Sequence, residues 1–545
     1  MVDPSRDSRL SGVGGAPEFD TCSSKPIAWF ATYRYRSAHS QSFRTRRWQL
    51  FNFFDYALLG LYFIAVTLIG VFFYRKNSSS AEFFVGGRAI SWLPVAISVI
   101  AADTSAITLL GNPGYAYEHD MTLMLYEFAY SVAAWLVILI FLPFYCRLKL
   151  YTAYEYLEQR FDVRVRWIAS ALFLIIRGSH VAIAMYAPAI VVTVFTGIPL
   201  HTTVLLMGVV ATLYTTMGGI RAVIWTDVMQ FAIVATGIVF TFFITITRVH
   251  GGLGTILQIG SEYGKWHTFD FSFSLTSDTT FWAMFFGGTI LALGTIGTDQ
   301  AVLQRYFTAK SEKECSRSLK AYSIILLPFN FGLIILGVFL FAFYHQHPDL
   351  AKGVPSSDWV LAYFAVHQLP HLLATLLTAS IFAASMGVVS AGLNSLSTCS
   401  VVDFYRRIWK RDASEAEFVK AGRMFTVGWG VFTTIGALYA GRLGELALAF
   451  GKIQGFVGGV MLGIFLLAIF SRRTSAIGAI VGSIVGMAFV CYLAFRTDIS
   501  FFWYGSISCL VTIVVGYGAS LLRPKPAGIP DYLFWQRGPK AEAQD

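Results

Sequence analysis

The sequence predicts an all-α polytopic membrane protein, and three observations lead to this fold class. Of the 545 residues, 56% are hydrophobic and only 13% are charged, whereas soluble domains carry about 25% charged residues. Apolar stretches of about 20 residues, the length of a membrane-spanning helix, recur along the whole chain. Lysine and arginine cluster between these stretches, as in cytoplasmic loops. The net charge of +10 therefore reflects membrane topology, and we expect no nucleic-acid partner.

We predict thirteen membrane spans from the apolar stretches. The block at 360–402 is long for one span, and we interpret it as an outer helical piece before Pro370 followed by the true span. The predicted spans are 53–74, 91–114, 121–146, 167–196, 200–217, 223–247, 279–303, 321–345, 360–402, 421–440, 444–470, 474–495 and 499–522.

Basic residues concentrate in one set of alternate loops, which predicts that this side is cytoplasmic. They are Arg75/Lys76/Arg88, Arg147/Lys149/Arg160/Arg164/Arg166, Arg305/Lys310/Lys313/Arg317/Lys320, Arg406/Arg407/Lys410/Arg411, Arg472/Arg473 and Arg523/Lys525. We therefore expect a multi-pass protein of the cell membrane, with its N-terminus outside and a cytoplasmic tail at 523–545. Five arginines at residues 34–47 lie on the predicted outer side, just before the first span. We interpret residues 1–50 as an extension that is disordered or precedes the true start.

Two predicted spans are interrupted by small and polar residues. The first contains 98-SVIAADTSAITLLGNPG-114, and the second, five spans later, contains 287-GGTILALGTIGTDQAVLQR-305. Interrupted helices in corresponding places are typical of secondary transporters built from inverted repeats, in which the freed backbone groups bind ion and substrate. The spacing predicts two five-helix repeats, at about 91–247 and 279–470 within a transporter domain at 51–522. The plainer interpretation is that the glycines only allow close helix packing.

Four stretches, two of which overlap these interruptions, resemble the sodium/solute symporter family, which includes sodium/glucose, sodium/iodide, proline and sialic-acid symporters. They follow the family's order along the chain. The stretches are 82-EFFVGGRAISWLPVAISVIAADTSA-106, 218-GGIRAVIWTDVMQ-230, 298-TDQAVLQRYF-307 and 392-GLNSLSTCSVVDFY-405. The resemblance implies a LeuT-type 5+5 inverted-repeat core, with one helix before it and two after it.

An ionisable group inside a span is a candidate functional residue because its insertion into the membrane is costly. Asp103 lies in the first interruption. The resemblance implies that the backbone carbonyls of Ala101 and Thr104, together with Ala384, help form the main sodium site, and that Asp103 belongs to this region. The alternative is a carboxylate that pairs with an arginine for structural reasons alone.

The resemblance also implies a substrate site. Glu127 matches a glutamate that contacts sugar in a bacterial galactose symporter, although a structural hydrogen bond is the alternative. Arg177 and His180 are three residues apart and share a helix face, so either is a candidate for holding a substrate carboxylate. The alternative is that Arg177 pairs with Asp103 or Glu127. The other candidate substrate residues are Thr108, Thr295 and Gln454.

Asp227 matches a residue that lines a second sodium site or an ion exit path in the family, with Ser390 as a candidate partner. The alternative is an interfacial cap or a partner for Arg221. The main site departs from the family's pattern, because Gly387 and Val388 stand where sodium-coupled members carry adjacent hydroxyls. Two explanations remain open: the Asp103 carboxylate replaces those ligands, or it carries a coupling proton.

These features predict a symporter that imports a small organic solute by alternating access, with Na⁺ as the coupling ion and no cofactor. Thr295 stands near the position where sugar symporters carry a stacking ring, so we favour an organic anion over a hexose. A proton-coupled or uncoupled carrier and a transporter-fold sensor are the alternatives. The sequence contains no HExxH, GxSxG or phosphate-cradling loop, so we expect no enzyme. We expect a monomer in contact with membrane lipid.

Overall fold

The computed structural model describes residues 52–75, 79–148, 150–443, 445–522 and 524. Within them the chain folds into helices, most of which are joined by short connections, with a longer one between α10 and η3. The predicted extension at 1–50 and nearly all of the predicted tail at 523–545 lie outside these residues. The helices are α1 (Phe53–Tyr74), α2 (Ser80–Val85), η2 (Gly86–Arg88), α3 (Trp92–Asp103), α4 (Ala106–Glu118), α5 (Met124–Ile140), α6 (Leu142–Arg147), α7 (Tyr154–Arg160), α8 (Val163–Thr196), α9 (Leu200–Arg248), α10 (Gly252–Glu262), η3 (Trp282–Gly287), α11 (Gly288–Thr298), α12 (Gln300–Tyr306), α13 (Glu312–Gln346), α14 (Pro348–Ala351), η4 (Ser357–Trp359), α15 (Val360–Gln368), α16 (His371–Cys399), η5 (Ser400–Trp409), α17 (Glu415–Leu443), α18 (Glu445–Phe470), α19 (Ala476–Arg496) and α20 (Phe501–Leu521).

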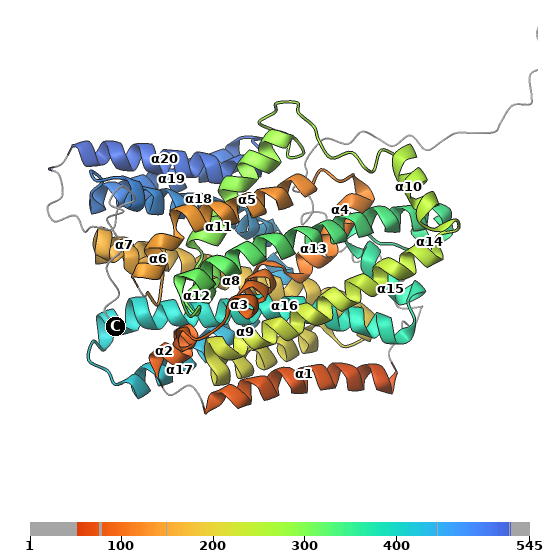
Figure 1. The fold of residues 1–545 in the computed structure, drawn as a ribbon, viewed down its shortest axis with the longest axis horizontal. Helices are drawn as coiled ribbons and strands as arrows, with labels where there is room; N and C mark the ends of the chain where they lie inside the picture. The colour runs from red at the N-terminus through yellow and green to blue at the C-terminus, as the bar shows by residue number, and fades with distance from the viewer. Residues whose placement is uncertain (1–51, 76–78, 149, 444, 523, 525–545) are drawn as a thin grey trace, which may run out of the picture.

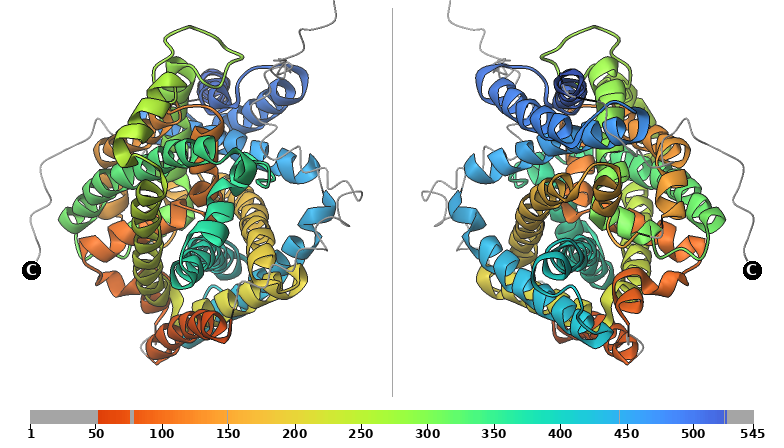
Figure 2. Two further views of the ribbon diagram at one scale, coloured as in Figure 1. Left: turned by 90° about the vertical axis from the view of Figure 1, so that its right-hand side faces the viewer. Right: turned by 90° about the vertical axis from the view of Figure 1, so that its left-hand side faces the viewer.

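The long helices form one bundle around α16. They run roughly along a common axis (Figure 1), and a view along that axis shows α16 inside the bundle, with α1 at one edge and the α19–α20 pair at the opposite edge (Figure 2). In the apolar stretch of α16 with η5, 78% of the residues are buried inside the protein, compared with 22% in α1. Because α16 is enclosed on all sides, its small and hydroxyl residues face other helices rather than lipid.

Seven helices among the described residues are long and apolar enough to cross a membrane, and there are eight if α3 and α4 form one bent span. Every predicted span coincides with one or more helices, but several of these helices are too short or not apolar enough to cross a membrane by themselves. The predicted division at Pro370 is confirmed, because α15 ends at Gln368 and α16 begins at His371.

The predicted spans 200–217 and 223–247 are joined in α9 without a loop. The backbone departs from helical geometry at Gly219, with φ 53° and ψ −154°. Only glycine adopts this conformation at little cost, and a Cβ atom at Gly219 would lie 2.6 Å from the carbonyl oxygen of Phe83. Since 49 helical residues extend about 73 Å, more than twice the hydrocarbon thickness of a bilayer, the turn at Gly219 divides α9 into two arms.

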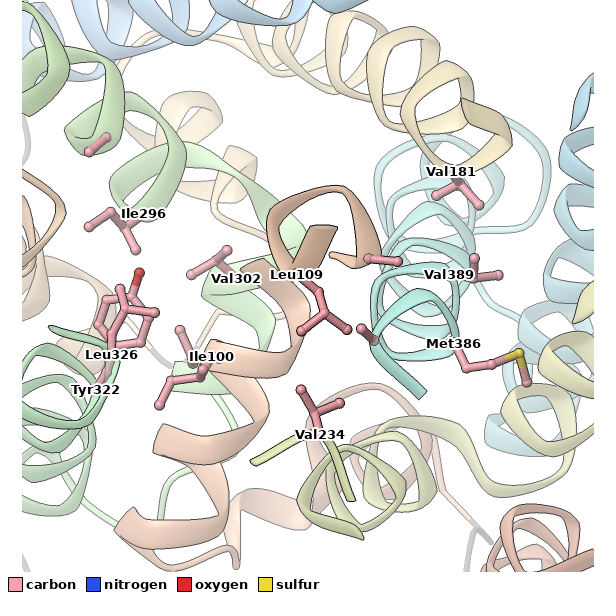
Figure 3. Packing of buried hydrophobic residues seen from close by; sticks show 14 of the residues in the cluster. Ile100, Leu109, Val181, Val234, Ile296, Val302, Tyr322, Leu326, Met386 and Val389 are labelled. Atoms are coloured by element: carbon pink, nitrogen blue, oxygen red, sulfur yellow. The ribbon is translucent and has the colours of Figure 1, made fainter. Parts of the chain in front are cut away.

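Both predicted interruptions are present as breaks in the helices. The first separates α3 from α4, whose axes differ in direction by 66°. The second lies at Asp299, where the backbone is extended (φ −77°, ψ 121°) between α11 and α12. Figure 3 shows Ile100 and Leu109, which flank the first break, packed between Tyr322 and Leu326 on one side and Met386 and Val389 on the other. The first break therefore lies between α13 and α16, in the interior of the bundle.

Candidate functional site

The first break exposes backbone groups that a continuous helix would satisfy internally. Thr104 takes an extended conformation after α3, and Ser105 caps α4, because its hydroxyl accepts hydrogen bonds from the backbone N–H groups of Ile107 and Thr108. The Asp103 carboxylate accepts a hydrogen bond from the Tyr322 hydroxyl at 3.0 Å. Asp103 is therefore directed toward α13.

The second break carries a carboxylate that pairs with the predicted arginine. The Asp299 side chain caps α12 by accepting from the N–H of Ala301, and its other oxygen lies 3.5 Å from Nη1 of Arg177 on α8. Arg177 is 4% exposed, and its Nε and Nη2 atoms have no hydrogen-bond partner in the described part of the chain. The alternative pairing of Arg177 with Asp103 or Glu127 is therefore wrong. Two guanidinium nitrogens of Arg177 remain available as donors.

Gly387 on α16 faces two oxygen atoms from other helices. A Cβ atom at Gly387 would lie 2.9 Å from the carbonyl oxygen of Ala101 on α3 and 3.3 Å from Oε1 of Gln230 on α9. Gln230 is 1% exposed, and its amide nitrogen donates to the Tyr62 hydroxyl at 3.2 Å. Its Oε1 atom has no hydrogen-bond partner among the described residues. Oxygen atoms thus border the space where a Gly387 side chain would lie.

Asp227 forms an ion pair inside the bundle. Its Oδ2 atom accepts from Nη2 of Arg305 at 2.8 Å and from the Ser98 hydroxyl at 2.5 Å. Nε of Arg305 also donates to the Ser98 carbonyl. The expected alternative, a pair between Asp227 and Arg221, is wrong, because Arg221 donates to the carbonyl of Gly86.

Arg305 corrects a second expectation. We counted it among the loop charges that define the cytoplasmic side, but it is only 1% exposed. It lies on α12, directly after the second break, and contacts α9 and α3. Since α3 directly precedes the first break, Arg305 connects the two interrupted regions. Arg160 and Arg166, counted in the same way, are also buried.

The Glu127 carboxylate is held by two amide groups. Oε1 accepts from Nδ2 of Asn112 on α4 at 3.2 Å, and Oε2 accepts from Nδ2 of Asn330 on α13 at 2.5 Å. This is the structural hydrogen bonding that the sequence analysis left open as an alternative to sugar contact.

The remaining predicted residues lie around these groups. Thr104 is buried at the first break. Ala384 and Val388, the residue after Gly387, are buried on α16. Ser390 donates to the Gly387 carbonyl. Thr108 and His180 are half-buried on α4 and α8. Thr295 is half-buried on α11, where its hydroxyl donates to the carbonyl of Leu291. Gln454 belongs to α18, but its side chain lies outside the part of the chain that the structure describes.

Several residues of this region were missed by the sequence analysis. Gln230 and Asp299 stand inside the quoted family stretches and Asn112 inside the first interruption, but none of them was singled out. Tyr322 and Asn330 carried no signal beyond being polar in an apolar run. Among the described residues, no group of three or more His, Cys, Asp or Glu side chains is placed to hold a metal ion. The oxygens available to a cation are therefore carbonyl, hydroxyl and amide oxygens with single carboxylates.

Residues 83–486 match the model of the sodium:solute symporter family. A sodium/sialic acid symporter of Proteus mirabilis is 33% identical over 471 residues, which cover 86% of this chain and 94% of the relative. A sodium-coupled monocarboxylate transporter 1 of Xenopus laevis is 31% identical over 462 residues, which cover 82% of this chain and 73% of the relative.

Two solved structures have similar folds. A substrate-bound, outward-open Na⁺-coupled sialic acid symporter is 31% identical, with a TM-score of 0.82 over 87% of this chain and 99% of the other. A nucleobase-cation-symport-1 family transporter is 13% identical, with a TM-score of 0.53 over 82% of this chain and 95% of the other. The second likeness concerns the fold alone.

Proposed function

The chain belongs to the sodium:solute symporter family, and on this premise we propose that it imports a small organic anion together with Na⁺ by alternating access. Members of the family are transporters rather than enzymes, so differential binding of ion and solute to two conformations supplies the mechanism. The alternative classes, a transporter-fold sensor and a proton-coupled or uncoupled carrier, predict no Na⁺-dependent uptake.

The topology belongs to the same proposal. The thirteen predicted spans form a LeuT-type 5+5 core preceded by one helix and followed by two, in the cell membrane, with the N-terminus outside and the C-terminus in the cytoplasm. Support comes from the two breaks at Asp103–Ser105 and at Asp299, which the proposed repeats would put in corresponding places. We propose that the chain works as a monomer surrounded by lipid, with no nucleic-acid partner and no cofactor besides the coupling ion.

The ion is held between α3, α9 and α16. The carbonyl oxygens of Ala101, Thr104 and Ala384 face the ion from the first break and from α16, as the family resemblance implies. Gly387 and Val388 supply no side-chain oxygen, and we assign the missing ligand to the unpartnered Oε1 of Gln230, which borders the same space as the Ala101 carbonyl. An amide oxygen is a suitable ligand for a hard cation.

Two acidic residues complete the ion region. Asp227 and Ser390 line a second position on the ion path, and the unpartnered Oδ1 of Asp227 is the oxygen it offers there. Asp103 contributes negative charge at the break, but its contact with Tyr322 directs its carboxylate toward α13. Gln230 therefore explains the altered ion site more directly than Asp103 does.

The organic anion is held by Arg177. The observation that carries this assignment is the pair of unpartnered guanidinium nitrogens on an arginine that is 4% exposed, because a guanidinium fork suits a carboxylate. His180 lies one helical turn further along α8, and we assign Thr108, Thr295 and the sequence-predicted Gln454 to the remaining substrate space. The relatives that are named for sialic acid and monocarboxylates carry acidic solutes.

The test is counterflow in proteoliposomes against a panel of carboxylates and neutral sugars, with and without Na⁺. We expect Na⁺-dependent uptake of a carboxylate, and we expect Arg177→Lys to raise its KM by at least about tenfold, the equivalent of about 1.4 kcal/mol. Arg160→Lys is the matched control, because Arg160 is a buried arginine that donates only to carbonyls at the ends of helices. Preferred uptake of a neutral sugar with an unchanged KM in Arg177→Lys would contradict the anion assignment, and a pH-driven, Na⁺-independent uptake would contradict sodium coupling.

A further inference from the structure

Arg177 offers one complete edge of its guanidinium group. The group is planar, and the N–H bonds of Nε and Nη2 point from the same edge in a fixed fork. These are the two atoms of Arg177 without a hydrogen-bond partner in the described part of the chain. The third nitrogen, Nη1, lies 3.5 Å from Oδ2 of Asp299. The unpartnered atoms therefore form one fork rather than two scattered donors.

Two other arginines of the chain use this edge to bind a carboxylate. Nε and Nη2 of Arg166 contact Asp403 at 2.8 and 2.5 Å. Nε and Nη2 of Arg164 contact Asp162 at 3.0 and 2.8 Å. In Arg177 the protein's own carboxylate lies at Nη1 instead, so among the described residues no carboxylate occupies the Nε–Nη2 edge.

Asp299 is held in place by the second break. Its backbone is extended, and its Oδ1 atom caps α12 by accepting from the N–H of Ala301 at 2.7 Å. The other oxygen, Oδ2, is therefore a fixed point beside Nη1 of Arg177. A long side chain loses rotamer freedom when a ligand immobilises it, and a residue that holds it beforehand lowers this cost of binding.

The charges around Arg177 do not by themselves favour an anion. Asp103 on α3 interacts electrostatically with both Arg177 and Asp299, so two carboxylates and one guanidinium group share this part of the bundle. An anion gains here from the geometry of the open edge rather than from an excess of positive charge. The Na⁺ ion proposed beside the Ala101 carbonyl would supply the balancing charge.

We propose that Asp299 is a positioning residue for the substrate. By holding Nη1, it keeps the Nε–Nη2 edge of Arg177 fixed and open, and this edge binds the carboxylate of the organic anion through two parallel hydrogen bonds. Asp299 itself does not touch the anion. The inference rests on the proposed import of an organic anion, and it adds which edge of Arg177 binds the anion and which residue orients that edge.

Asp299→Asn tests this role without removing the cap of α12, because asparagine caps a helix as well as aspartate does. The full-length chain is reconstituted in proteoliposomes with Na⁺, and uptake is measured for propionate, benzoate and sialic acid, three carboxylates of increasing size. We expect the KM of a transported carboxylate to rise at least about tenfold while kcat changes little, as for an interaction that serves binding alone. Thermal unfolding should remain close to that of the wild type.

The lost charge of Asp299 has an effect of its own, because its removal favours any anion electrostatically. The Arg177→Lys background isolates this effect, since lysine keeps the positive charge but has no planar edge to orient. There we expect Asp299→Asn to leave KM unchanged or to lower it. A double-mutant cycle over the four proteins then separates the position of Arg177 from the charge of Asp299.

Asp162→Asn is the matched control. Asp162 is likewise an N-cap aspartate that contacts an arginine, at the start of α8 and outside the proposed site, so its loss should leave KM unchanged. Asp299→Ser, a second neutral N-cap, repeats the test if Asp299→Asn does not fold. Equal changes of KM in the Arg177 and Arg177→Lys backgrounds would overturn the role of Asp299 alone. A wild-type chain that takes up none of the carboxylates with Na⁺ would instead refute the proposed function.

Discussion

At the scale of single residues, the polar side chains inside the bundle are organised in pairs that cross between helices. Arg305 binds Asp227 and the Ser98 carbonyl, and Arg177 lies near Asp299. Breaking a buried pair by removing one partner typically costs about 3–5 kcal/mol. Arg177 remains partly unpartnered in such surroundings, and this is why we propose it as the residue that holds the organic anion.

Gly387 gives the sharpest prediction at this scale. We expect Gly387→Ala to lower the free energy of unfolding by about 1–3 kcal/mol, the usual cost of overpacking, because the added Cβ atom would lie 2.9 Å from the Ala101 carbonyl. The displaced carbonyl should also raise the half-saturating Na⁺ concentration for uptake. Thermal unfolding in detergent and sodium titration of uptake measure the two effects.

Gly428→Ala is the control for Gly387→Ala. Gly428 lies in α17, and no atom of a neighbouring residue lies within 4 Å of the position that an added Cβ would take. Alanine should therefore be neutral there or stabilise the helix by up to about 1 kcal/mol. If both variants behave alike in unfolding and in sodium titration, the assignment of Gly387 to the border of the ion site is wrong.

At the scale of elements, the breaks were predictable and their partners were not. Asp103, Thr104 and Ser105 in an apolar run, and a run of glycines and threonines near Asp299, indicate where a helix is interrupted. The pairing of Asp227 with Arg305, 78 residues apart, follows from the packing of both α9 and α12 against α3, which hydropathy does not encode. For the same reason the orientation of Gln230 toward Gly387 could not be read from the sequence.

The cap of α4 supplies the prediction for this scale. We expect Ser105→Ala to cost about 1 kcal/mol of stability, since the hydroxyl that accepts from the N–H groups of Ile107 and Thr108 is lost. A loosened start of α4 should also raise the half-saturating Na⁺ concentration, because the neighbouring carbonyls form part of the proposed ion site. Both quantities are measured on the purified chain and in proteoliposomes.

Ser475→Ala separates the two effects. Ser475 caps α19 by accepting from the N–H of Gly478, outside the proposed core, so its loss should cost similar stability and leave the sodium titration unchanged. A Ser105→Ala variant whose sodium titration also remains unchanged would show that the cap does not support the ion site.

At the scale of the whole molecule, the sequence predicted the helical bundle and its family because hydropathy and four motif stretches extend over most of the chain. It predicted the two arms of α9 as separate spans, but not that they meet at Gly219 without a loop, because a positive φ at a single glycine leaves no mark in hydropathy. It also treated Arg305 as a surface charge, since a count of basic residues cannot distinguish a loop from the end of a buried helix. Predictions from composition, hydropathy and motifs therefore succeeded, and those that depended on tertiary contacts did not.

The contact between η4 and α4 is a tertiary contact that makes the stability of the whole molecule depend on pH. The Ser357 hydroxyl donates to Glu118 at the end of α4 at 2.5 Å. The neighbouring Asp358 has its pKa raised from 3.8 to about 6, first by burial and then by the negative charge of Glu118. Because the folded protein holds this proton more tightly than the unfolded chain does, Asp358 contributes stability that is complete below about pH 4 and is lost as the pH rises through about 6.

We therefore expect the wild-type free energy of unfolding to fall between about pH 4 and pH 6 relative to that of Asp358→Asn. Asp349→Asn is the control, because Asp349 is an exposed carboxylate paired with Lys352 and has a lowered pKa, so that its removal should leave the decline in place. Thermal or denaturant unfolding of the three proteins across this pH range measures the difference. Parallel curves for the wild type and Asp358→Asn would mean that Asp358 ionises alike in the folded and unfolded states, and the η4–α4 contact would then not depend on its protonation.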